Sequence, residues 1–193
     1  GIEIPKTVYA HGWWTFNKEK ISKSRGKVIN VDELISIAGV DSARYFLFRE
    51  ASFGEDGDFS TQALIDRHNN ELANKLGNLV SRTSALAEKY GIEKTPNTLL
   101  KKLNLKQIEK HFDEFRIDKA LNEIFAFIDI CNEFIQSKKP WETKDTKVLY
   151  QLVEAIREIA KLLSPFIPET AQKISDIFKT DKIKKSPILF KKI

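Results

Sequence analysis

Three stretches of this 193-residue chain carry an apolar or small side chain at every third or fourth position, and this spacing constrains the fold most. Alternating steps of three and four residues keep such side chains on one face of an α-helix. The three stripes are Leu72, Leu76, Leu79, Thr83, Leu86 and Tyr90; Ile117, Leu121, Ile124, Ile128, Cys131 and Ile135; and Leu149, Leu152, Ile156, Ile159 and Leu163. Three such helices can bury their stripes against one another, so the sequence predicts an antiparallel α-helix bundle with these positions in its core.

Two further helices are expected beside these three. A less regular helical pattern covers residues 103–115, and a last one covers residues 168–178. Pro140, Pro165 and Pro168 mark the breaks between helices, because proline cannot continue a helix interior. The whole region from residue 60 onward therefore reads as helical.

The segment before residue 60 has a different pattern and predicts a short α/β unit. Residues 7–16 mix β-branched and aromatic side chains without a helical period, which favours a strand. Asp32 and Asp41 are predicted to cap two short helices, the second over residues 42–51. Residues 52–59 contain two glycines and three acids and are predicted to be a connector.

Charge and cysteine content limit the class of protein. The net charge is +5, but residues 179–193 hold six lysines and one aspartate and account for all of it. This basic tail can touch phosphates or be a solvated end, so charge alone does not indicate RNA binding. A single cysteine, Cys131, excludes an internal disulfide and fits a reducing cytoplasm. No apolar run approaches the length of a membrane span, so we expect no membrane partner.

A cationic loop near the start of the chain is a candidate phosphate site. Residues 17–27 carry five cations against one anion, and the sequence Lys20-Ile21-Ser22-Lys23-Ser24-Arg25-Gly26 alternates lysines with hydroxyls. Lysines act as mobile point charges and hydroxyls as added donors, so such a loop can wrap a triphosphate. A solvated basic turn is the alternative that the pattern alone leaves open.

Asn74, Asn78 and Arg82 recur at four-residue spacing and form one polar ladder, which we expect to face away from the first stripe. Asparagine is unfavourable in a helix interior by roughly 0.5–0.7 kcal/mol against alanine. Amides and a planar guanidinium can read the edges of bases. An ordinary polar outer face is the alternative.

Lys139-Pro140-Trp141 follows the second stripe. A tryptophan held by a preceding proline can stack on an unpaired base, as RNA-binding proteins commonly require. The alternative is a lid that covers the end of the bundle.

Several motifs together resemble the methionyl-tRNA synthetase family of class I aminoacyl-tRNA synthetases. The cationic loop is similar to the KMSKS motif, with Ile21 in place of methionine. His11-Gly12-Trp13 before it, residues 41–50 (DSARYFLFRE) and residues 54–60 (GEDGDFS) narrow the resemblance to this family. It runs from about Pro5 to about Phe178.

This resemblance implies a ligase that activates methionine with ATP and then charges the methionine tRNA. Lys23 would be the principal catalytic contact with the leaving pyrophosphate, and Lys20 the secondary one. The ATP-binding residues would be Lys20, Ile21, Ser22, Lys23 and Ser24. The family reads the anticodon with an Asn-x-x-x-Asn-x-x-x-Arg ladder and a Pro-Trp pair, so the anticodon-binding residues would be Asn74, Asn78, Arg82, Pro140 and Trp141.

The resemblance also divides the chain. Residues 1–59 would be the C-terminal remnant of the catalytic domain, residues 60–178 a helical anticodon-binding domain, and residues 179–193 a basic tail. The second nucleotide motif of the class, HIGH, is absent. We therefore expect part of a longer enzyme, inactive alone, with neither a metal site nor a bound cofactor.

In the full enzyme, ATP with Mg²⁺ and methionine would be substrates, and the anticodon loop of the methionine tRNA would be the partner. Two alternatives remain open. One is a tRNA-binding module without catalysis, which needs the ladder but not the lysines. The other is a helical interaction scaffold, which needs neither.

Overall fold

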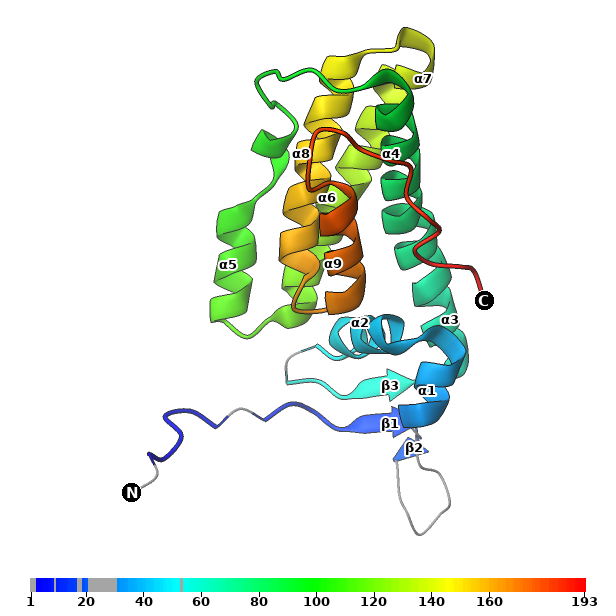
Figure 1. The fold of residues 1–193 in the computed structure, drawn as a ribbon. Helices are drawn as coiled ribbons and strands as arrows, with labels where there is room; N and C mark the ends of the chain where they lie inside the picture. The colour runs from blue at the N-terminus through cyan, green and yellow to red at the C-terminus, as the bar shows by residue number, and fades with distance from the viewer. Residues whose placement is uncertain (1–2, 9, 17–18, 21–30, 53) are drawn as a thin grey trace.

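A computed structural model shows a small sheet followed by a helical bundle (Figure 1). The structure describes residues 3–8, 10–16, 19–20, 31–52 and 54–193. The helices within these ranges are α1 (Val31–Ala38), α2 (Val40–Glu50), α3 (Thr61–Arg67), η2 (His68–Gly77), α4 (Asn78–Tyr90), η3 (Leu100–Lys102), α5 (Leu105–Asp113), α6 (Ile117–Lys138), α7 (Pro140–Thr143), α8 (Thr146–Leu163) and α9 (Pro168–Ile177). The predicted mainly α class and the antiparallel bundle are confirmed.

The sheet has the strand order β2-β1-β3, with β1 at Trp14–Phe16, β2 at Glu19–Lys20 and β3 at Gly57–Phe59. β1 runs antiparallel to β2 and parallel to β3. Of the strand expected over residues 7–16, the described residues form strand only at the last three. The expected connector over residues 52–59 ends in a strand, which three residues are too few to reveal by periodicity.

The predicted helix caps before the bundle are wrong. Asp32 lies within α1, and α2 begins at Val40 with Gly39 (φ 81°) at its N-cap position. Asp41 instead turns to another helix, where its Oδ2 accepts a hydrogen bond of 2.6 Å from the backbone N–H of Thr170 in the first turn of α9. The free N–H groups at a helix N-terminus attract carboxylates. The fold brings the N-terminus of α9 to Asp41, so this side chain bonds a helix that is distant in sequence and does not cap its own helix.

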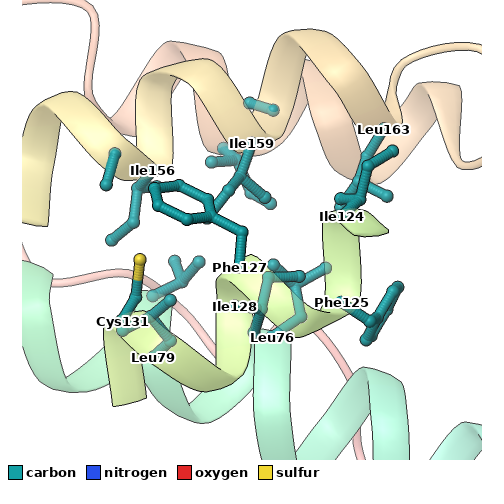
Figure 2. Packing of buried hydrophobic residues seen from close by; sticks show 14 of the residues in the cluster. Leu76, Leu79, Ile124, Phe125, Phe127, Ile128, Cys131, Ile156, Ile159 and Leu163 are labelled. Carbon is teal, nitrogen blue, oxygen red and sulfur yellow. The ribbon is translucent and has the colours of Figure 1, made fainter. Parts of the chain in front are cut away.

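The bundle core forms where α6 packs against η2 and α4 on one side and α8 on the other (Figure 2). Figure 2 shows Phe127 and Ile128 of α6 among side chains such as Leu76 and Ile156 from the neighbouring helices. All the predicted stripe positions are buried except Leu86, Tyr90 and Ile117, which are half-buried at the stripe ends. The core prediction is confirmed.

One long helical rod, made of α3, η2 and α4, runs without a break from Thr61 to Tyr90. Ser60 begins it, because its Oγ accepts a hydrogen bond of 3.1 Å from the N–H of Ala63. Within η2 the backbone bonds connect residues five apart, so this part is wider than an α-helix. The sequence stripe did not predict that widening, because leucines at four-residue steps suit either helix.

The last fifteen residues, which we call the C-terminal strap (residues 179–193), pack back onto the bundle (Figure 1). Ile183 and Phe190 belong to the main core cluster. The N–H of Ser186 donates to the Oγ of Ser84 on α4 over 2.9 Å. The interpretation of this segment as a solvated end is therefore wrong, although its lysines are exposed. A helical period could not reveal it, because the strap contains no helix.

A buried histidine links the strap to the region before the bundle. His68 is 4% exposed, and its Nε2 lies 2.9 Å from the carbonyl oxygen of Lys191 in the strap. Its Nδ1 lies 2.9 Å from the Oγ of Ser42 on α2. One side chain of the rod thus holds two segments that are far apart in sequence.

Glu71 is the centre of a second polar link between α2 and the rod. Its carboxylate accepts hydrogen bonds from Tyr45 and from Arg49 (3.2 Å) on α2, and from Arg67 (2.6 Å) on the preceding turn. Burial raises the pKa of Glu71, but the Tyr45 hydrogen bond and the two arginine charges outweigh it, so its pKa lies below the usual 4.5. Burial, followed by the charge of Glu71, raises the pKa of the Tyr45 hydroxyl.

Replacing Glu71 should therefore loosen the joint between α2 and the rod. Glu71→Ala leaves the Tyr45 hydroxyl without its acceptor and removes the carboxylate that Arg49 and Arg67 share, although each arginine keeps one other partner. We expect a loss of about 3 kcal/mol in the free energy of unfolding. Glu88→Ala, at an exposed position of α4, is the control and should cost less than about 0.5 kcal/mol. Urea unfolding at pH 7 measures both.

The same effect should depend on pH. Because the folded-state pKa of Glu71 is lowered, its contribution is complete above pH 4.5 and is lost as the pH falls below that value. The stability difference between the wild type and Glu71→Ala should therefore shrink below pH 4.5. Equal losses in the Glu71 and Glu88 variants at pH 7 would contradict the role of this joint.

Candidate nucleic-acid interface

An open groove of about 670 Å³ runs between the rod and α6. It is lined by Asn74, Lys75, Asn78 and Arg82 from the rod and by Asp129, Asn132, Glu133, Gln136 and Ser137 from α6. The rod presents this face because the stripe residues Leu72, Leu76 and Leu79 are fully buried on another side. The expected orientation of the ladder away from the stripe is confirmed.

The two asparagines of the ladder offer complete amides. Asn74 and Asn78 are exposed, and within the described part of the chain neither side chain makes a hydrogen bond. Each amide can donate and accept at the same time, which is what the edge of an unpaired base requires.

Arg82 lies at the far end of the ladder and is held in two ways. Its Nη2 donates to the Oε1 of Gln136 on α6 over 3.2 Å, and its guanidinium carbon lies 5.3 Å from the ring centre of Trp141. Among the described residues it has no carboxylate partner. The planar fork is therefore fixed in place, and its charge is not neutralised by an ion pair.

The short helix α7 brings Trp141 to the end of this groove. Lys139 adopts a left-handed conformation (φ 46°), which ends α6, and Pro140 occupies the first turn of α7. Neither Pro140 nor Trp141 lines the groove itself: Pro140 is buried, and Trp141 is half-buried and packs partly against the main core. Its indole N–H donates to Glu142 over 3.3 Å. The structure thus places Pro140 behind the site and Trp141 beside it.

The charges of the groove nearly balance. Lys75 forms an ion pair of 2.7 Å with Asp129, and both side chains are about two-fifths exposed. Glu133 adds a second carboxylate, whose negative charge offsets the positive charge of Arg82 in the total for the groove. A groove of amides with little net charge is suited to base edges, since phosphate binding relies on an excess of cations.

The contribution of α6 was missed in the sequence. Asp129, Asn132, Glu133 and Gln136 recur at three- and four-residue steps, which places them on one helix face. That spacing could have predicted a polar face on α6, but the prediction for this helix rested only on its apolar stripe. Only the packing of α6 beside the rod shows that this polar face completes the groove.

The residues around the cationic loop are also brought together. A side chain on Gly12 would place its Cβ 2.1 Å from the carbonyl oxygen of Glu55, so only glycine fits there. The N–H of Trp13 donates to Asp56 over 2.7 Å. The two distant motifs beginning at His11 and at Gly54 therefore meet across β1 and β3.

Most of the predicted ATP-binding residues lie outside the part of the chain that the structure describes. The backbone of Lys20 forms the end of β2, and Ile21, Ser22, Lys23 and Ser24 lie outside the described residues. Across the described ranges, no group of three or more potential ligand side chains is placed to hold a metal ion. No helix in the same ranges is both long and apolar enough to cross a bilayer.

Comparison with known families divides the chain into two matches. Residues 1–84 match the family of class I tRNA synthetases described as "tRNA synthetases class I (M)". Residues 97–192 match the anticodon-binding domain of tRNA ligases. The second match includes nearly all of the C-terminal strap, in keeping with its packing on the bundle.

Individual relatives point the same way. The chain is 41% identical to a methionine–tRNA ligase of Fusobacterium nucleatum over 94% of its own length and 32% of the relative. It is 40% identical to that of Rickettsia conorii, over 91% of this chain and 38% of the relative. The Mycobacterium tuberculosis methionyl-tRNA synthetase bound to methionyl-adenylate superposes with a TM-score of 0.81 at 32% identity, covering 91% of this chain and 39% of that one. The chain thus spans about a third of the length of these relatives.

The half-buried position of Trp141 gives a prediction for stability. Trp141→Ala should cost about 1–2 kcal/mol of unfolding free energy, because only part of the ring leaves apolar surroundings. Phe127→Ala is the control for a fully buried ring and should cost about 3–5 kcal/mol. Urea unfolding of both variants measures this difference. Equal losses would show that Trp141 is an interior lid and not an available surface.

Proposed function

Because this chain belongs to the class I tRNA synthetases, in their methionine group, we propose that it is the part of a methionine–tRNA ligase that reads the anticodon and supplies the KMSKS-like loop. One observation carries this proposal: the ladder and α6 line a single groove, and Trp141 lies against Arg82 at the end of it. Its free amides, its fixed guanidinium and its adjacent indole are the groups that a single-stranded RNA loop requires.

Recognition would divide among these side chains by their chemistry. Trp141 stacks on the first anticodon base with the exposed part of its ring, which contributes about 1–3 kcal/mol per base. Asn78 and Arg82 bond base edges, and Asn74 supports that contact. Pro140, being buried, acts only by holding Trp141. Arg82 already lies over the indole, so a base that stacks there meets the guanidinium as well.

The loop would act on ATP in the longer protein. Methionine attacks the α-phosphorus of ATP through its carboxylate oxygen, and the bond to pyrophosphate breaks, which leaves negative charge on the departing group. Lys23, with Lys20 in support, stabilises that developing charge more than it stabilises bound ATP. Ser22 and Ser24 donate to phosphate oxygens, and Ile21 supports the loop. Mg²⁺ enters with ATP as part of the substrate.

The proposed division of labour follows the change of sequence pattern at residue 60; the first family match extends to residue 84 and so also includes the ladder. Residues 1–59 carry the loop, and residues 60–178 carry the anticodon groove. The C-terminal strap belongs with the groove, because it fills part of the same core. The partners are methionine, ATP and the methionine tRNA, and we place the protein in the cytoplasm, where translation uses its product.

Substituting the ladder tests the reading of the anticodon. Arg82→Lys keeps the charge but loses the fork, so we expect discrimination among anticodon bases to fall by about 1–3 kcal/mol while affinity for unrelated stem-loops is kept. Asn78→Ala should cause a similar loss. Lys161→Ala, an exposed position on α8, is the control and should change neither quantity. Titration of stem-loops at fixed salt measures both, and unchanged discrimination in all three variants would refute the anticodon proposal.

Substituting the loop tests the proposed catalysis in a full-length ligase that contains this chain. Lys23→Ala should lower the rate of methionine-dependent pyrophosphate exchange by at least about 100-fold, while ATP affinity changes little. Lys18→Ala, a cation outside the motif, is the control. A normal rate with weakened ATP binding would assign Lys23 to substrate binding alone. Intact exchange in both variants would leave a tRNA-binding module without catalysis as the better interpretation.

A further inference from the structure

The wide helix η2 changes the direction in which the ladder points. In an α-helix of 3.6 residues per turn, a residue four positions ahead overshoots a full turn by about 40°. In η2, where bonds connect residues five apart, four positions fall short of a full turn, so the drift is in the opposite sense. Asn74 to Asn78 crosses the wide segment, and Asn78 to Arg82 crosses the α-helix. The rotation around the helix axis from Asn74 to Asn78 is therefore opposite in sense to the rotation from Asn78 to Arg82. As a result, the three side chains lie closer to one line along the rod than they would in a uniform α-helix.

The end of η2 is held from outside the rod by Asn132 of α6. The Nδ2 of Asn132 donates to the backbone carbonyl of Lys75 over 3.3 Å, and to the carbonyl of Ile128 in its own helix over 3.1 Å. Lys75 is the first of the three residues between the two ladder asparagines. Asn132 is half-buried, so solvent competes only partly for this bridge. A single amide therefore ties the groove wall on α6 to the backbone that carries Asn74 and Asn78.

Two further contacts surround the same turn. The side chain of Lys75 pairs with Asp129, one turn before Asn132 on α6, over 2.7 Å. On the other side of the rod, a Cβ at Gly77 would lie only 3.2 Å from the carbonyl oxygen of Leu72, five residues earlier. The wide turn thus has little room for a side chain at Gly77. The contacts that hold the turn from the α6 side are therefore the Asn132 bridge and the ion pair of Lys75 with Asp129.

We propose that Asn132 is a positioning residue for base recognition: through the Lys75 carbonyl it holds the wide turn that aligns Asn74, Asn78 and Arg82 on one line. This proposal rests on the proposed reading of the anticodon by the ladder. It assigns to Asn132 a role through the backbone of the rod, distinct from a direct contact with RNA. Without the bridge, the turn at Lys75 relaxes towards an ordinary α-helix, and the two asparagines fan apart.

The first test uses the chain without RNA. Asn132→Leu keeps a side chain of similar size but removes both donated hydrogen bonds. We expect the backbone amides of residues 76–80 to exchange with solvent about tenfold faster than in the wild type, since local opening of the wide turn becomes easier. Ser137→Ala is the control, because Ser137 lines the same groove but bonds only its own helix, at the carbonyl of Phe134. Equal exchange in the two variants would overturn the proposal.

The second test measures selectivity between the methionine anticodon stem-loop and loops with single base changes. Asn132→Leu should lower selectivity about tenfold, with affinity for unrelated loops unchanged, as expected for one misplaced edge contact. In an Asn78→Ala background the same substitution should cost less than it does in the wild type, because one of the contacts that Asn132 aligns is already missing. If the wild type is selective and Asn132→Leu keeps that selectivity, the positioning role alone is overturned. Additive losses in the double variant would overturn it as well. A wild type without selectivity would overturn the proposed function, and this proposal with it.

Discussion

The structure depends on one continuous helical rod, from Thr61 to Tyr90, that is packed on several sides at once. Leu72, Leu76 and Leu79 are fully removed from solvent against α6 and α8. Burial of this kind contributes about 1.5–3 kcal/mol for each side chain, which fixes the rotation of the rod about its own axis. Once that rotation is fixed, the side chains of the polar ladder point into the groove beside the polar face of α6. The groove is thus a consequence of the core.

The same rod also joins the bundle to the region before it. α2 contributes Tyr45 to the main core, whereas its neighbour Phe46 packs in a separate cluster with Leu34 and Phe59. Between the two clusters lie polar contacts centred on Glu71 and His68. Shared hydrogen bonds fix orientation more narrowly than apolar contact does, because they require particular distances and angles. These contacts therefore hold α2, which packs against β3, in a defined orientation to the rod.

Particular residues show how far the sequence alone could lead. The stripes located the core because a buried helix face repeats with the helical period, and the ladder was found by the same spacing. The cap predicted at Asp41 was wrong, since its carboxylate serves the N-terminus of α9 that the fold brings near it, and Asp32 lies inside α1 instead of before it. The strand at Gly57–Phe59 was missed because three residues carry no period. The reason that the motifs beginning at His11 and at Gly54 occur together is visible only in the fold, where Gly12 packs against the backbone of Glu55.

The sequence by itself determined the helices, their buried faces and the residue types available for chemistry, because these follow from local spacing. Tertiary structure decided which polar faces meet. It placed the polar face of α6 opposite the ladder, set Trp141 beneath Arg82, and folded the basic tail into the core. It also widened the rod at η2. These features join residues that are distant in the chain or depend on backbone hydrogen bonds, and neither leaves a periodic trace in the order of side chains.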